Sequence, residues 1–140
     1  MTLPDRVTPS ALAWELPQTL LGALTYVGER ARGRVVRVER ERDRVLVETT
    51  GTAISLGHLV FWSRCSSRWH TLDARNRAHE LGHAHQSRLL GPLYLPVVGI
   101  PSTARAIFAF AFREVTGRKW DRYYDGFPER WADRLGGVVR

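Results

Sequence analysis

The sequence contains one cysteine and one lysine among its 140 residues. A single cysteine excludes an internal disulfide, so a hydrophobic core must hold the fold together. Residues 1–30 lack the basic segment, apolar run and cleavage site of a secretory signal. We therefore expect a cytoplasmic protein with one domain over residues 1–140, for which a hydrophobic content of 44% is ordinary.

Because lysine is scarce, the positive charge rests on arginine, and the net charge is +7. Arginine binds phosphate well, so an arginine-rich nucleic-acid binder is one alternative. Between Arg34 and Arg44, however, basic residues alternate with acidic ones, which is typical of solvated hairpin faces, and no nucleic-acid motif accompanies them. The sequence predicts no specific nucleic-acid partner and leaves attraction to an acidic substrate or an anionic lipid surface open.

The sequence also lacks an uninterrupted hydrophobic run of membrane-spanning length. The segment Leu89–Phe112 has one charged residue, but prolines and glycines break it. We expect a buried loop, Gly91–Pro101, followed by a helix, Ser102–Thr116, that Gly117 ends. The residues expected to fill the core are Ile107, Phe108, Phe110, Ala111 and Phe112. The alternative is that Gly91–Phe112 contacts the inner face of a membrane, or apolar substrate side chains.

The first half of the chain predicts a helix and three strands. An amphipathic helix is expected over Ser10–Glu29, with a kink or an early boundary at Pro17. Its apolar stripe, which we expect to cover the core, is Leu12, Leu16, Leu20, Leu24 and Val27. Alternating valine and charge in Arg34–Arg40 and Arg44–Thr50 predict an antiparallel hairpin.

A third strand is expected over Ala53–Trp62, with Gly57 as a bulge or a point of close backbone approach. The three strands would form an antiparallel sheet in an α+β fold. We expect this third strand to be the exposed edge to which an extended peptide substrate could add itself, and the alternative is an ordinary strand with a covered edge.

The most informative motif is H-E-x-x-H, formed by His79, Glu80 and His83. The segment Ala74–Leu90 favours a helix, with Asp73 as its N-cap and Gly91-Pro92 as a stop signal. On a helix, histidines four residues apart lie on one face and can bind one Zn²⁺ ion. Glu80 would reach a water molecule that the ion acidifies. The alternative is an amphipathic helix with two structural histidines.

A catalytic zinc site needs a third protein ligand, and Glu129 is the candidate. Phe127-Pro128 favours a helix start, after which Glu129, Ala132, Asp133 and Gly136 fall along one stripe. Asp133, one turn later, could accept the free ring N–H of a ligating histidine. The alternative is that both carboxylates pair with surface arginines.

Together, His79-Glu80-Leu81-Gly82-His83 and Glu129-Arg130-Trp131-Ala132-Asp133 resemble the two motifs of gluzincin metallopeptidases of the HtpX-like kind, and in size the chain resembles the minigluzincins. The resemblance covers about half the chain. It implies a zincin-like fold whose C-terminal helices carry the third ligand. It also implies that His79, His83 and Glu129 bind zinc, that Glu80 is the general base and that Asp133 supports a histidine.

The motifs thus predict a zinc-dependent endopeptidase acting on a peptide or protein. The alternative is a non-catalytic, zinc-stabilised module that binds a protein or membrane surface. Tyr123 and Tyr124 are candidate oxyanion stabilisers, although packed aromatic residues are the simpler interpretation. Cys65 is expected to be a surface or half-buried thiol, and the alternative is an inhibitory ligand to the zinc. The remaining histidines, His58, His70 and His85, are expected to be structural or exposed.

Overall fold

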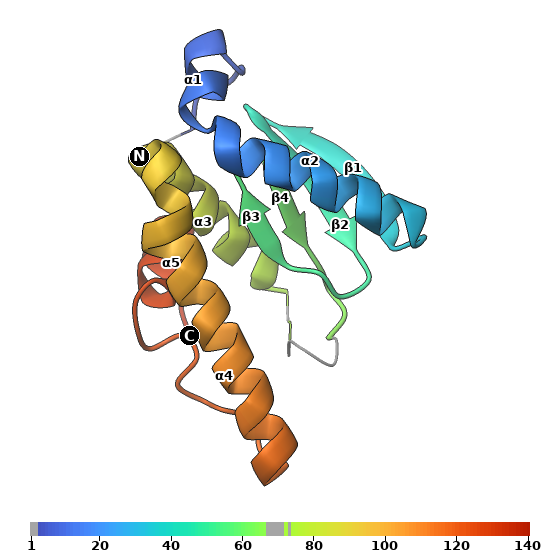
Figure 1. The fold of residues 1–140 in the computed structure, drawn as a ribbon, viewed down its shortest axis with the longest axis vertical. Helices are drawn as coiled ribbons and strands as arrows, with labels where there is room; N and C mark the ends of the chain where they lie inside the picture. The colour runs from blue at the N-terminus through green and yellow to red at the C-terminus, as the bar shows by residue number, and fades with distance from the viewer. Residues whose placement is uncertain (1–2, 67–71, 73) are drawn as a thin grey trace.

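A computed structural model describes residues 3–66, 72 and 74–140. The fold is α+β, as expected, with helices packed around a four-stranded sheet (Figure 1). The strands are β1 (Val35–Glu41), β2 (Arg44–Thr49), β3 (Ile54–Leu56) and β4 (Leu59–Trp62). The α-helices are α1 (Pro9–Trp14), α2 (Leu16–Ala31), α3 (Asn76–Leu90), α4 (Ile100–Thr116) and α5 (Glu129–Gly136).

The sheet is mixed and has the strand order β1-β2-β4-β3. The predicted hairpin is confirmed, because β1 and β2 pair antiparallel. The prediction of one strand over Ala53–Trp62 in a three-stranded antiparallel sheet is wrong. Gly57, with φ of 63°, turns the chain back, so β3 pairs antiparallel with β4 while β4 runs parallel to β2. A Cβ at Gly57 would lie 2.2 Å from Thr19 Oγ1, so this turn also packs tightly against α2.

Helices α2 and α3 cover opposite faces of the sheet. Val60 and Trp62 of β4 pack with Leu46 and with Ala84 of α3 in the hydrophobic core. Leu59 belongs to the other face, because successive strand residues point in opposite directions. There the backbone of α2 approaches so closely that a Cβ on Gly22 would lie 3.1 Å from Leu59 Cβ. Strand β3 forms the sheet edge nearest the N-terminal half of α3.

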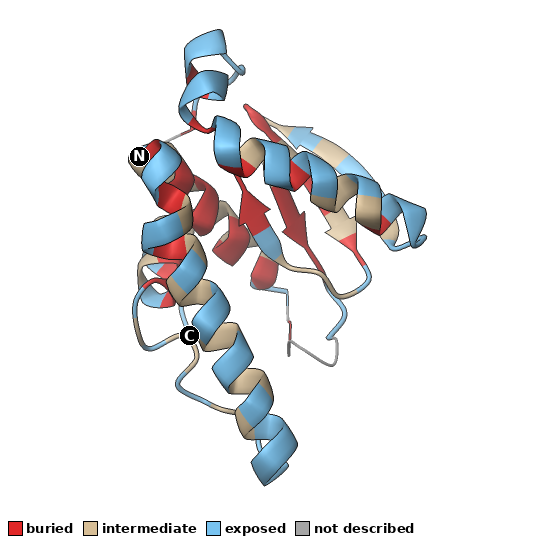
Figure 2. Cartoon of the chain, in the orientation of Figure 1, coloured by how far each residue is buried: buried red, intermediate tan, exposed pale blue. Residues whose placement is uncertain are grey.

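The N-terminal helix differs from its prediction in two ways. It is two helices that meet at Glu15, so the break is a boundary just before Pro17 and not a kink at Pro17. The expected core stripe of α2 faces solvent, with Leu24 71% and Val27 64% exposed (Figure 2). The buried side of α2 consists of Gln18, Gly22 and Glu29. Gln18 and Glu29 face polar partners in the rest of the protein, and Gly22 lies where the helix backbone packs closely against the sheet.

The segment after α3 is helical where a loop was expected. A 3₁₀ turn (Gly91–Leu93) and a π-helical turn (Leu95–Gly99) lead directly into α4. The three prolines do not break this path, because each lies in the first turn of its segment, where a missing N–H costs no hydrogen bond. As predicted, Gly117 ends the helix in the left-handed conformation.

The expected core role of α4 is wrong. None of its residues is buried, and Ile107 is 57% exposed (Figure 2). By length and composition the helical stretch Leu95–Thr116 is apolar enough to cross a membrane, which alone is a weak signal. Its C-terminal part extends away from the sheet, and residues 117–128 return along it to α5 (Figure 1). The predicted N-cap of the preceding helix, Asp73, lies outside the described residues.

Candidate metal centre

The site begins with a close contact between α3 and α5. A Cβ on Gly82 would lie 1.9 Å from the carbonyl oxygen of Ala132, and one on Gly136 would lie 2.1 Å from that of Ala78. Only glycine fits at both positions, so the two helices approach backbone to backbone. The predicted stripe of α5 faces α3, with Glu129, Ala132 and Asp133 buried.

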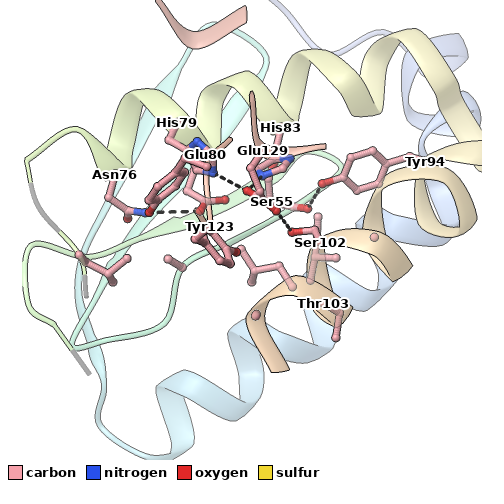
Figure 3. A pocket seen from close by; sticks show the side chains of 17 residues that line it. Ser55, Asn76, His79, Glu80, His83, Tyr94, Ser102, Thr103, Tyr123 and Glu129 are labelled. Carbon is pink, nitrogen blue, oxygen red and sulfur yellow. Dashed lines mark hydrogen bonds and ion pairs between the residues drawn. The ribbon is translucent and has the colours of Figure 1, made fainter. Parts of the chain in front are cut away.

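This contact brings the three predicted ligands together (Figure 3). Glu129 Oε2 lies 3.0 Å from Nε2 of His79 and 3.1 Å from Nε2 of His83. All three side chains are buried, and their facing atoms lie within 4.8 Å of one another. Two imidazoles and a carboxylate in this arrangement match the donor set of a catalytic zinc site.

The other ring nitrogens of both histidines are already used. Nδ1 of His79 lies 2.7 Å from Asp133 Oδ1, and Nδ1 of His83 lies 2.7 Å from Gln86 Oε1. The amide of Gln86 is oriented by its Nε2, which donates to the carbonyl of Pro128. Each Nδ1 faces an acceptor oxygen, which leaves Nε2 of both rings directed at Glu129 Oε2. Three atoms that face one another in this way can share a cation, either a proton or a metal ion.

The electrostatics of the triad follow from this arrangement. Burial by itself would lower the pKa of His79, but hydrogen bonds to Asp133 and Glu129 outweigh it and raise the pKa to about 9. Burial would raise the pKa of Glu129, but hydrogen bonds to His79 and His83 hold it well below its usual range. At neutral pH the protonated His79 ring thus pairs with the carboxylates of Glu129 and Asp133.

Glu80 lies next to the triad with one oxygen uncommitted. Asn76 Nδ2 donates to its Oε1 at 3.4 Å, whereas its buried Oε2 has no hydrogen-bond partner. Burial raises the pKa of the Glu80 carboxyl, while the nearby His83 and His79 oppose the rise. Leaving a buried carboxylate oxygen without a partner costs free energy, so Glu80 Oε2 is available to accept a hydrogen bond from a water molecule or a ligand.

A cavity of about 210 Å³ opens beside the triad and Glu80. Strand β3, helix α4 and the segment before α5 form its walls (Figure 3). Tyr123 and Tyr124 both line it, so the structure brings the two predicted oxyanion candidates to the site. Cys65 is exposed and is not among the residues that line this cavity.

Sequence reasoning missed three polar residues that hold the site in place. These are Asn76, which positions Glu80; Gln86, which orients His83; and Ser102, whose hydroxyl donates to Glu129 Oε1 at 2.6 Å. Asn76 precedes Glu80 by four residues and Gln86 follows His83 by three, so helical spacing signals both contacts. Ser102 reaches Glu129 from another helix, and no local pattern predicts that contact.

A second buried cluster contains a similar set of donors. Glu15, Asp43 and His58 also place facing atoms within 4.8 Å of one another. Here two arginines lie among the carboxylates, since Arg44 Nη1 is 2.9 Å and Arg88 Nε is 3.0 Å from Glu15. Their charges balance those of Glu15 and Asp43, so a further cation is not needed. Burial, followed by the nearby Arg44, lowers the pKa of His58 and keeps the ring neutral.

No family model, curated protein or solved structure matches this chain. The two helices that carry the predicted ligands, α3 and α5, are also the parts of the site that the sequence anticipated most closely.

Proposed function

We propose that this chain is a small zinc-dependent endopeptidase of the gluzincin type. The observation that carries the proposal is the convergence of His79, His83 and Glu129 through three acceptor atoms, next to the unpartnered Oε2 of Glu80. The adjacent cavity favours an open coordination position, as a catalytic zinc requires. A helix-borne histidine pair with a glutamate from a second helix also supports the resemblance to a zincin-like fold.

A Zn²⁺ ion held by His79, His83 and Glu129 would supply the Lewis acidity that polarises the scissile carbonyl and lowers the pKa of the attacking water. Glu80 takes the proton from that water through Oε2 and later passes it to the leaving amine. Asp133 and Gln86 hold the two rings in the tautomers that present Nε2 to the ion. Ser102 fixes the carboxylate of Glu129 from the opposite side.

Two further assignments belong to the same proposal. A hydroxyl of Tyr123 or Tyr124, from the cavity wall, would stabilise the oxyanion of the tetrahedral intermediate. A peptide substrate would lie against the edge strand β3, whose Ile54 and Ser55 line the cavity. Tyr94 already donates to the Ser55 carbonyl at 2.8 Å, so this carbonyl is not free to pair with a substrate.

The decisive experiment measures metal content and hydrolysis separately. We expect one zinc per wild-type chain by plasma mass spectrometry, and a sharp loss in Glu129→Gln, because the remaining two histidines leave the site one ligand short. Glu15→Gln is the matched control, since it removes a buried carboxylate from the arginine-containing cluster and should leave the zinc in place.

Glu80→Gln tests the chemistry. We expect zinc to stay bound while kcat on a quenched peptide library falls by about 10²–10⁴-fold, the usual contribution of a general base. Wild-type activity in Glu80→Gln would rule out the mechanism. Stoichiometric zinc whose removal unfolds the protein, with no hydrolysis of any peptide, would instead favour the zinc-stabilised binding module.

A further inference from the structure

The two longest helices turn their apolar sides to solvent, although both were expected to bury them. On α2 the exposed apolar residues that share one stripe are Leu16, Leu20, Ala23, Leu24, Val27 and Ala31, and the exposed Leu21 lies beside this stripe. On α4 they are Ile100, Ala104, Ile107, Phe108, Ala111 and Val115. Each set has the offsets 0, 4, 7, 8, 11 and 15, which describe one apolar stripe along an α-helix. We call these sets the α2 stripe and the α4 stripe.

Both stripes face the same side of the molecule. In Figure 2 the pale blue bands of exposed residues on the two helices are turned toward the viewer, with the sheet behind α2. From Leu16 to Gly28, α2 carries no charged residue. In α4 the charge at Arg105 is directed away from its stripe, because its Nε and Nη2 donate to the carbonyl of Tyr123 at 2.9 and 2.7 Å.

The C-terminal ends of the two stripes are basic. Residues 30–34 and 113–125 hold seven exposed basic and three exposed acidic residues. The basic residues are Arg30, Arg32, Arg34, Arg113, Arg118, Lys119 and Arg122. An apolar surface bordered by arginine and lysine is complementary to a lipid bilayer with anionic headgroups. A second copy of this chain is a less favourable partner for the surface, because it also carries a net charge of +7 and would be repelled.

The contacts of α4 with the site favour lying on a bilayer over crossing it. Ser102 is bound to Glu129, and Gly99, Ser102, Thr103 and Ala106 line the cavity. A helix that crossed a membrane would have to leave this wall and break the Arg105 hydrogen bonds. A helix lying in the interface keeps both, because only the opposite, apolar side enters the lipid.

From these observations we propose that the protein docks on the surface of anionic phospholipid membranes through the α2 and α4 stripes. The leucine, isoleucine and phenylalanine side chains enter the headgroup and acyl boundary, and the basic residues at the stripe ends contact lipid phosphates. Docking itself does not depend on the proposed peptidase function. If that function also holds, the cavity lies on the inner side of a membrane-bound helix, which favours substrates presented at the lipid surface.

Vesicle co-sedimentation tests the docking directly. Full-length protein is mixed with vesicles of phosphatidylcholine alone, or of phosphatidylcholine with phosphatidylglycerol. We expect binding to the anionic vesicles, and a partition coefficient at least about tenfold lower for the double variant Leu24→Gln/Ile107→Gln, because each change removes a large apolar side chain from lipid. Glutamine is tolerated in helices, so circular dichroism should remain unchanged.

Two controls separate docking from other effects. Val36→Gln changes an apolar residue of similar exposure on β1, outside both stripes, and should bind as wild type does. Arg118→Gln should lower binding to anionic vesicles by about fivefold, the effect expected for one basic residue near the surface. Glu80→Gln should bind vesicles fully, so a failure of docking and a failure of the peptidase proposal are distinguishable.

The proposal is overturned by any of three results. The first is wild-type protein that does not bind anionic vesicles. The second is binding that the Leu24→Gln/Ile107→Gln variant retains and that salt alone removes, which would show unspecific attraction by arginine. The third is light scattering that shows a dimer for the wild type and a monomer for Leu24→Gln/Ile107→Gln. That result would show that the two stripes bind a second copy of the chain.

Discussion

The two buried clusters differ in charge more than in donor type. Each combines histidine with carboxylate, and each holds its facing atoms within the same 4.8 Å. Around Glu15 and Asp43, two guanidinium groups supply the positive charge. Around Glu129, no guanidinium approaches the carboxylate in the described part of the chain, and two imidazole lone pairs meet it instead. Because the donor geometry of the two clusters is similar, we propose metal binding only at Glu129 on the basis of its local charge balance.

The largest effect on this comparison is expected from removing an arginine. Arg44 is fully buried and also donates to the carbonyl of Gly57 at 2.6 Å. Arg44→Met leaves Glu15 and Asp43 with an uncompensated buried charge, so the free energy of unfolding should fall by about 3–5 kcal/mol in urea titrations. Arg37→Met, which removes an exposed ion pair with Glu39, should cost less than about 1 kcal/mol. Equal losses would refute the distinction.

The packing beneath the metal centre gives the next effect. In Gly82→Ala the added methyl group meets the Ala132 carbonyl, so α3 and α5 must separate. We expect a loss of about 1–3 kcal/mol of stability together with weaker zinc binding. Gly28→Ala is the matched control, because its Cβ would meet only the flexible end of Arg32, and the better helix propensity should stabilise α2 by up to about 1 kcal/mol. Zinc affinity unchanged in Gly82→Ala would contradict this account.

The protonation of the two clusters predicts different responses to pH. His79 has a pKa raised to about 9 in the metal-free protein, so it is protonated at neutral pH and must release that proton when zinc binds. Zinc affinity should therefore rise about tenfold per pH unit between roughly pH 7 and 9. His58, with its lowered pKa, adds nothing in this range. Asp133→Asn should flatten the dependence in competition titrations; an unaltered slope would show that Asp133 does not hold the proton on His79.

The smallest effect on zinc affinity is expected from the hydrogen bond between Ser102 of α4 and Glu129, the proposed third ligand. Ser102→Ala removes the hydroxyl that donates to Glu129 and should weaken zinc binding by about 1 kcal/mol, or roughly fivefold. Thr103→Ala lies at the adjacent position on the cavity wall and should leave zinc affinity unchanged. If both variants bind zinc as tightly as wild type, Ser102 does not position the carboxylate.

The sequence predicted correctly those helices and strands that short-range residue patterns determine. The proline-free segment Ala74–Leu90 predicted α3, and alternating valine predicted the β1–β2 hairpin. The stripe containing Glu129 and Asp133 predicted the buried face of α5. The split of the third strand was missed because the turn at Gly57 is stabilised by packing against α2, which local sequence does not reveal.

Amphipathic patterns identified the apolar sides of α2 and α4 but not their direction. Burial was assigned to these sides because hydrophobic residues are usually inside. The protein instead meets α2 through Gln18, Gly22 and Glu29, and meets α4 through Ser102 and small residues. In the second cluster, the partners Glu15, Arg44 and Arg88 come from α2's start, β2 and α3, so only the fold brings them together.

The glycine contacts between α3 and α5 also determine which carboxylate becomes the ligand. Glu129 and Asp133 lie one turn apart on α5, so a slip of that helix by about 5.4 Å would carry Asp133 into the place of Glu129. Gly82 of α3 contacts the backbone of Ala132, and Gly136 of α5 contacts the backbone of Ala78, so each helix contributes one glycine to the interface. If α5 slipped by one turn, side chains would replace these glycines at the points of closest contact and would clash with the facing backbone. The register of the two helices thus places Glu129, rather than Asp133, between the Nε2 atoms of His79 and His83.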